Sequence, residues 1–172
     1  SRAAEAKGIP MAPQPGAEHL RLQALAGLWT GDEMLSDTPW MKGGPATGHV
    51  DNRMTLGGFL LEQDYRQERD GREAVRAKGL FTYDSDRNEY RLFWFDNLGF
   101  PPADPAGGTW EGDTLTVLRR SPRAIARHTF AIRNAHEYEL AIENSWDGGA
   151  SWMPVMTGSY RRRSEDRPSS VA

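Results

Sequence analysis

Two residues combine a side chain that can transfer a proton with a position on the inward face of a predicted strand. His128 lies in an alternating apolar segment, and Asp96 ends the aromatic stretch YRLFWFD. An imidazole and a carboxylate commonly act as general acid and base, and hydroxyls such as those of Tyr65 and Tyr138 can donate hydrogen bonds to developing charge. No nucleophile elbow, P-loop or H-E-x-x-H sequence accompanies them. If the protein is an enzyme, we therefore expect cofactor-independent acid–base chemistry on a hydrophobic substrate, with His128 and Asp96 as the catalytic residues.

The elements that must position these residues are almost all strands. The segment PGAEHLRLQALAG has helical capacity, with a proline near its start and Gly27 at its end. After it, apolar and polar residues alternate with a period of two, and turn signals separate the runs. About ten strands joined mostly by hairpins predict an all-β fold, a single up-and-down antiparallel β-barrel with a short N-terminal helix. The strands are expected near residues 28–36, 47–56, 59–68, 73–83, 89–97, 108–112, 114–119, 125–133, 137–146 and 151–162.

Length and composition indicate one folded domain. The 172 residues are divided into a flexible N-terminal arm at 1–16, a barrel at 17–163 and a disordered tail at 164–172. A net charge of −3 does not favour a nucleic-acid partner. The sequence has no cysteine, which excludes disulfides, thiolate catalysis and cysteine-ligated metals. We expect no metal and no cofactor.

The hydropathy pattern gives no sign of a membrane partner. No apolar run approaches the length of a membrane span, and the first sixteen residues lack the apolar core of a signal peptide. We therefore expect a cytoplasmic protein, as a monomer or a homodimer.

The inward faces of the predicted strands are mostly apolar but also carry polar side chains. They include several hydrogen-bonding side chains, which a plain packed core would have to satisfy, and the small residues Ala77 and Gly79 leave room beside them. This mixture is typical of a ligand cavity, so we expect a small, largely hydrophobic organic molecule to bind inside the barrel. A filled barrel that serves only as a structural module is the competing interpretation. The expected ligand-binding residues are Phe59, Leu61, Gln63, Tyr65, Phe81, Trp94, Phe130, Tyr138 and Asn144.

The first predicted strand begins with an unusual sequence, GLWTG, in which a large aromatic side chain stands between two glycines. Paired glycines in a strand mark a bend or a close backbone approach. Trp29 could therefore start an ordinary strand, or it could close one end of the barrel while Gly27 and Gly31 let the chain pass tightly around it.

Several longer segments carry a family resemblance. PGAEHLRLQALAGLWTG, LGGFLLEQDY, TYDSDRNEYRLFWFDNLG and DGGASWMPVMTGSYRR together resemble a family of bacterial lipocalin-like proteins known as a domain of unknown function, over residues 15–162. The resemblance implies a calycin-type barrel and no established activity. In the lipocalin and fatty-acid-binding class, the tryptophan closes the floor and an arginine of the last strand packs across it. Here the resemblance implies Trp29 as this structural floor, with an arginine of GSYRRR across it, Arg161 in the first place and Arg162 as the alternative.

The G-x-W-x-G segment is also distantly similar to that of nitrobindin-type haem barrels. That resemblance implies haem binding through a histidine on a late strand, and His128 is the only inward candidate. Because Gln63, Asn144 and Asp96 would make the lumen more polar than a porphyrin face prefers, we rank haem below an organic ligand.

Overall fold

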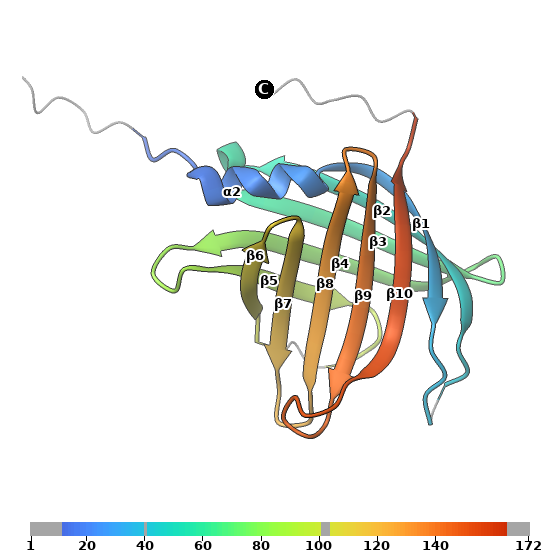
Figure 1. The fold of residues 1–172 in the computed structure, drawn as a ribbon. Coiled ribbons are helices and arrows are strands. Elements are labelled where there is room, and N and C mark those ends of the chain that lie inside the picture. The colour runs from blue at the N-terminus through green and yellow to red at the C-terminus, as the bar shows by residue number, and fades with distance from the viewer. Residues whose placement is uncertain (1–11, 40, 101–103, 165–172) are drawn as a thin grey trace, which may run out of the picture.

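The computed structural model describes residues 12–39, 41–100 and 104–164 (Figure 1). Each strand is hydrogen-bonded to its neighbours in the chain, and β1 also pairs with β10, which closes an antiparallel barrel. The predicted fold is confirmed. The strands are β1 (Gly27–Leu35), β2 (Gly44–Thr55), β3 (Leu60–Arg69), β4 (Arg72–Asp84), β5 (Glu89–Asp96), β6 (Ala106–Glu111), β7 (Thr114–Arg120), β8 (Ile125–Asn134), β9 (Glu137–Ser145) and β10 (Met153–Arg162).

A short helical segment covers one end of the barrel, which we call the helix end. It consists of α2 (Ala17–Arg21) and a 3-10 turn, η1 (Leu22–Leu25), and Figure 1 shows it lying across the end where β1 begins. Leu22 and Leu25 are buried under it. Gly27 then adopts a φ of 128°, which a side chain would disfavour, and this lets the chain turn from the helix into β1. The opposite end, where β1 ends and β10 begins, is called the far end.

The barrel is not equally tight all the way around. Most neighbouring strands share seven to nine residue pairs, but β5 and β6 share only three, from Tyr90 to Leu92. Within the described part of the chain, β5 therefore continues toward the far end with no ladder partner on its β6 side. Trp94 and Asp96 lie on this part of β5, on the inward face.

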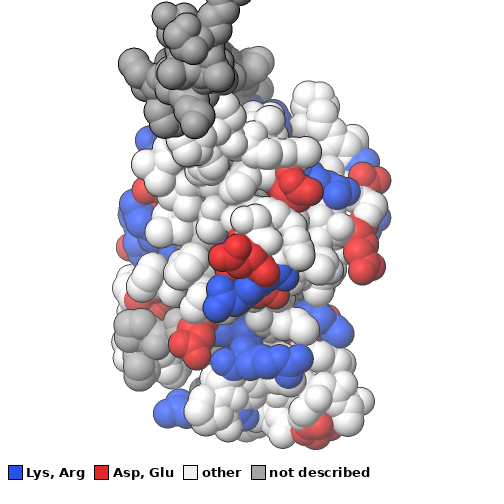
Figure 2. All heavy atoms as spheres, turned by 90° about the vertical axis from the view of Figure 1, so that its left-hand side faces the viewer, with Lys and Arg blue, Asp and Glu red and all other residues white. Residues whose placement is uncertain are grey.

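The predicted termini lie mostly outside the described residues. The arm at 1–16 is described only from residue 12, and the tail at 164–172 only at Ser164. None of the described helices is long and apolar enough to span a membrane. On the face drawn in Figure 2, acidic and basic side chains are interspersed, without a large area of one sign.

Candidate functional site

The lumen changes from apolar to polar along the inward face of β7, β8 and β9. Because the three strands are paired in register, their inward residues form rows that run across the sheet. The row nearer the helix end is apolar, the next has a histidine at its centre, and the row nearest the far end has a cation and an amide on either side of an alanine. The rows are Leu115, Phe130 and Leu140; Val117, His128 and Ile142; and Arg119, Ala126 and Asn144.

Trp29 lies at the helix end with 1 % of its surface exposed. Its Nε1 donates a hydrogen bond of 3.0 Å to the carbonyl of Leu25, and its ring meets that of Tyr138 edge to face at 4.8 Å. The guanidinium of Arg162 lies 4.3 Å from the centre of the indole and donates to the carbonyl of Ala26 at 2.7 Å. A tryptophan under an arginine therefore closes this end.

The arginine over Trp29 is the alternative expected from the sequence, Arg162, and not the first choice. Arg161 is exposed on the outer face, 3.9 Å from a carboxylate oxygen of Glu137, so its assignment to the floor is wrong. The register explains the difference, since β1 pairs Trp29 with Arg162 and the alternation of β10 turns Arg161 outward.

Four of the predicted ligand-binding residues lie in the packed core near the helix end. Their rings and alkyl groups pack against one another; the rings of Phe81 and Phe130, for example, meet at 5.7 Å. Side chains this tightly surrounded contribute chiefly to the stability of the barrel. The four are Leu61, Phe81, Phe130 and Tyr138.

Phe59 lies outside the lumen. It follows the 3-10 turn η2 (Leu56–Gly58) and precedes β3, and its ring meets that of His19 edge to face at 5.1 Å. Strand β3 begins one residue later than expected, so Phe59 is not part of its inward face. Its assignment to the cavity is wrong.

A buried carboxylate that the sequence pattern did not predict belongs to Glu33 on β1, which is 3 % exposed. The hydroxyl of Tyr65 donates to both of its oxygens at 2.8 and 2.9 Å, and the hydroxyl of Tyr160 donates to Oε2. The side-chain amide of Gln67 donates to Oε1 at 3.1 Å. The carboxylate is thus fully hydrogen-bonded, which is the condition for burying a charge at tolerable cost. Strand parity was the available signal, because Trp29 inward on β1 places Glu33 inward too.

Glycines make the space for this carboxylate and its tyrosine. A Cβ atom on Gly31 would lie 2.3 Å from the Tyr160 ring, and one on Gly158 would lie 2.6 Å from it. A Cβ on Gly48 would lie 2.4 Å from Glu33 Oε2. The second glycine of GLWTG is therefore required by a side chain of the last strand.

The tyrosines around Glu33 are held in their neutral form. Burial raises the pKa of Tyr65, Tyr138 and Tyr160 well above the ordinary value, and the nearby charge of Glu33 raises each of them further. They act as hydrogen-bond donors to the carboxylate at neutral pH, except Tyr138, whose ring stacks on Tyr160 at 4.7 Å.

The inward polar residues of the far half are arranged differently. Three of them form no hydrogen bond with any described residue: Gln63, His128 and Asn144. A side-chain polar atom that is both fully enclosed and without a hydrogen-bond partner occurs, in the described chain, only at three other residues: His49, Asn52 and Thr55. The polar atoms of the three lumen residues must therefore touch accessible space. His128 is only partly buried, although it lies in mid-strand between buried inward neighbours. Polar groups without protein partners therefore gather on the inward face of the far half.

The room expected beside Ala77 and Gly79 is filled by other side chains. Trp94 is on the inward face of β5, and its ring lies over Gly79, so that a Cβ there would be 3.2 Å from the indole. Ala77 is buried beneath its neighbours. The room that Gly79 leaves is therefore occupied by Trp94, which is itself partly exposed.

His128 is neutral at physiological pH. Burial, together with the positive charge of Arg119, lowers its pKa to about 4. A neutral imidazole donates one hydrogen bond through one ring nitrogen and accepts one through the other, but it is a poor proton donor at pH 7. No described residue accepts a hydrogen bond from its ring, so His128 lacks the second partner that usually orients a haem ligand.

Asp96 is already engaged. Its Oδ2 accepts a hydrogen bond of 3.0 Å from Trp94 Nε1, and its Oδ1 accepts one of 3.0 Å from the backbone of Leu98. The carboxylate thus fixes the indole and caps the turn after β5. It forms no hydrogen bond or ion pair with His128, so the structure does not join the two residues into an acid–base pair.

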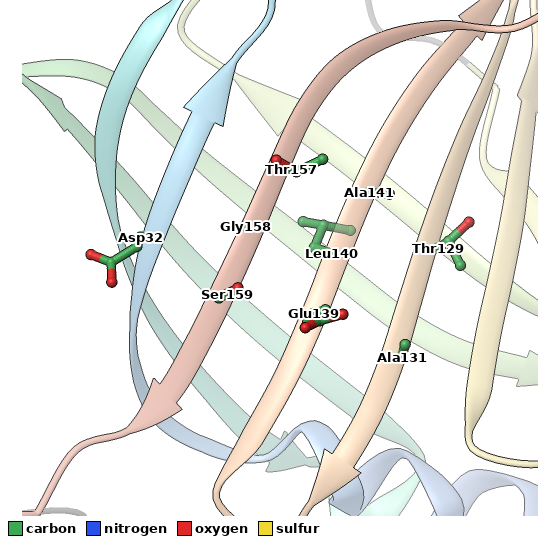
Figure 3. A pocket seen from close by; sticks show the side chains of 9 residues that line it. All are labelled: Asp32, Thr129, Ala131, Glu139, Leu140, Ala141, Thr157, Gly158 and Ser159. Atoms are coloured by element: carbon green, nitrogen blue, oxygen red, sulfur yellow. The ribbon is translucent and has the colours of Figure 1, made fainter.

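A groove of about 450 Å³ lies on the outside of the barrel, over β1, β8, β9 and β10. Figure 3 shows the side chains that line it, most of them small, with Asp32 and Glu139 beside them. Its polar side chains face bulk water, and Glu139 is already paired with Arg133. We therefore place the candidate site in the lumen, where polar groups lack partners.

The structure is thus a ten-stranded antiparallel barrel with one packed, aromatic end and inward polar residues in its other half. The family described as "Protein of unknown function (DUF1579)" matches residues 14–162, and the chain belongs to this family. No match is found among curated protein sequences.

Solved structures with the same fold are distant in sequence. Rv2717c from M. tuberculosis is 15 % identical, with a TM-score of 0.65 over 87 % of this chain and 99 % of that one. The S-type phycobiliprotein lyase CPES from Guillardia theta is 9 % identical, with a TM-score of 0.60 over 88 % and 98 % of the two chains. At these identities the likeness establishes the fold.

Proposed function

We propose that this protein binds a small, largely hydrophobic organic molecule in the far half of its lumen. The observation that carries the proposal is the set of inward polar side chains, Gln63, His128 and Asn144, that reach accessible space without a protein partner. Lumen groups of this kind gain from a ligand that presents a few hydrogen-bonding atoms on an apolar body. Trp94 and Ile142, both partly exposed, supply the apolar surface around them.

A catalytic use of His128 and Asp96 has less support. An acid–base pair needs at least one group with a pKa near neutrality and access to the substrate. The pKa of His128 lies far below neutrality. Both carboxylate oxygens of Asp96 already accept hydrogen bonds, from Trp94 and from the backbone of the following turn. Binding is therefore the function that this geometry favours.

Nile red, a neutral dye that fluoresces in apolar surroundings, tests the proposal. It should bind the wild-type protein, and Ala126→Leu, which adds bulk to the lumen beside His128, should weaken binding by about tenfold or more. Ala131→Leu is the matched control, because Ala131 is on the same strand but lines the outer groove. Circular dichroism and melting temperature establish that both variants fold.

The outcomes separate the lumen from the outer groove. Loss of dye binding in Ala126→Leu alone supports the lumen site. Loss in Ala131→Leu alone would place the dye in the outer groove and overturn the proposal, as would the absence of dye binding by the wild-type protein.

A further inference from the structure

The acidic side chains inside the barrel are internally satisfied. Glu33 accepts hydrogen bonds from Tyr65, Tyr160 and Gln67, and Asp96 accepts them from Trp94 and the backbone of the next turn. Neither carboxylate needs a partner from a ligand. A cationic ligand would therefore find no free acid among these residues.

Arg119 is in the opposite situation. Strand β7 turns Leu115, Val117 and Arg119 to the same face, and the first two are fully buried in the lumen. Arg119 forms no ion pair and no hydrogen bond with any described residue. On the outer face of the next strand, by contrast, Arg127 is paired with Glu143 at 3.0 Å. The far half of the lumen thus contains an unmatched positive charge.

The surroundings of Arg119 are suited to an anion. Ala126 lies directly opposite it, and Asn144 lies opposite Ala126 on the following strand, so a small side chain separates a guanidinium from an amide. His128 is the diagonal neighbour, one row deeper. A guanidinium presents a planar fork of N–H donors that matches a carboxylate, and the amide of Asn144 adds a further donor. Because Ala126 carries only a methyl group, no large side chain of β8 stands between these donors.

We propose that the molecule bound in the lumen is an organic carboxylate, whose acid group is held by Arg119 and Asn144 and whose apolar body extends toward Trp94 and Ile142. This inference rests on the proposed function, since it names the chemical class of the ligand that occupies the same lumen. The apolar row formed by Leu115, Phe130 and Leu140 limits how deep the body of the ligand can reach.

A fluorescent acid and its uncharged ester provide the test. Dansylaminoundecanoic acid and its methyl ester share one apolar body and differ in the charge at one end. The wild-type protein should bind the acid more tightly than the ester by about tenfold or more, the range of a charge-assisted hydrogen-bonded pair. Arg119→Met should reduce binding of the acid to that of the ester and leave the ester unchanged.

Arg120→Met is the matched control, since it removes the same charge from the adjacent, exposed position. It should leave binding of both probes as in the wild type. Asn144→Leu should weaken the acid alone, by a smaller factor than Arg119→Met. If Arg119→Met does not fold, Arg119→Lys, which keeps the charge but loses the fork, should bind the acid less tightly than the wild type.

The two proposals fail in different ways. Equal binding of acid and ester by the wild-type protein, or equal losses in Arg119→Met and Arg120→Met, would overturn the carboxylate assignment and leave lumen binding intact. Binding of neither probe, together with no binding of Nile red, would overturn both.

Discussion

The helix end and the far half of the lumen are built by the same ten strands and the same alternation, yet the first is filled by aromatic rings and the second contains polar groups without protein partners. At the helix end, Trp29, Tyr138 and Tyr160 are each exposed by 2 % or less, and their rings are in contact. In the far half, His128 and Asn144 point into the lumen with nothing in the described chain to satisfy them. Packing at one end supplies the stability that allows polar groups at the other end to remain unmatched.

The buried carboxylate marks the transition between the two. Glu33 is polar, as the inward residues of the far half are, but its hydrogen-bonding partners all lie within the barrel. Gln63, His128 and Asn144 have no such network, and a ligand of the kind proposed above would supply the missing partners.

The largest expected effect is at the helix end. Trp29→Ala removes a fully buried indole and its hydrogen bond to Leu25, and should lower the free energy of unfolding by about 3–5 kcal/mol in a urea titration. The matched change in the far half, Trp94→Ala, should cost less than half as much because that ring is partly exposed. Equal losses would remove the distinction between the two regions.

The next effect is an acid sensitivity of the far half. His128 has a pKa of about 4 in the folded protein against 6.5 when unfolded, so between these pH values only the unfolded chain binds the proton. The free energy of unfolding should therefore fall by about 2–3 kcal/mol as the pH is lowered through this window, as measured by urea midpoints. His128→Gln should lack this part of the loss, whereas the exposed His136→Gln should lose as much as the wild type.

If His128→Gln and the wild type lost stability in parallel on acidification, His128 would be as accessible to protons as a surface histidine. The far half would then be open to bulk water and not a defined pocket.

The smallest expected effect is a difference in stability between variants of two adjacent arginines, Arg161 and Arg162. Arg162→Met removes the guanidinium from Trp29 together with its hydrogen bonds to Ala26 and Ala135, and should cost about 1–2 kcal/mol in unfolding free energy. Arg161→Met, on the outer face, should change it by less than about 0.5 kcal/mol. The reverse order would mean that the closing arginine had been misassigned.

Strand alternation made much of this barrel predictable. The period of two identifies the strands, and it also assigns the inward face of β4, β5, β8 and β9 because one face of each is mostly apolar. The alternation alone is enough to turn His128, Asp96 and Asn144 inward. What it leaves undetermined is which inward residues touch one another, since this depends on the register and on closure between β1 and β10.

The missed residues show the same limit. Glu33 and Arg119 are charged, and charge in a strand suggests a solvent-facing position; parity with Trp29 and with Val117 overrides that rule. Arg162 is distinguished from Arg161 only by the pairing of β10 with β1. The position of Phe59 depends on the 3-10 turn before β3, which the alternation does not reveal.

The hydrogen bond between Tyr160 and Glu33 joins residues 127 positions apart, and this has a consequence for folding during synthesis on the ribosome. Strand β1, which carries the carboxylate of Glu33, leaves the exit tunnel early. The hydrogen-bond donors on β3 are synthesised soon afterwards, but the donor on β10 is synthesised last. Until β10 emerges, the Tyr160 ring that packs against Gly31 is missing, and one edge of β1 stays unpaired. Long-range closure of this kind is slow, and unpaired edges invite association with other chains. The nascent protein therefore depends on the ten residues of β10 to become a barrel at all.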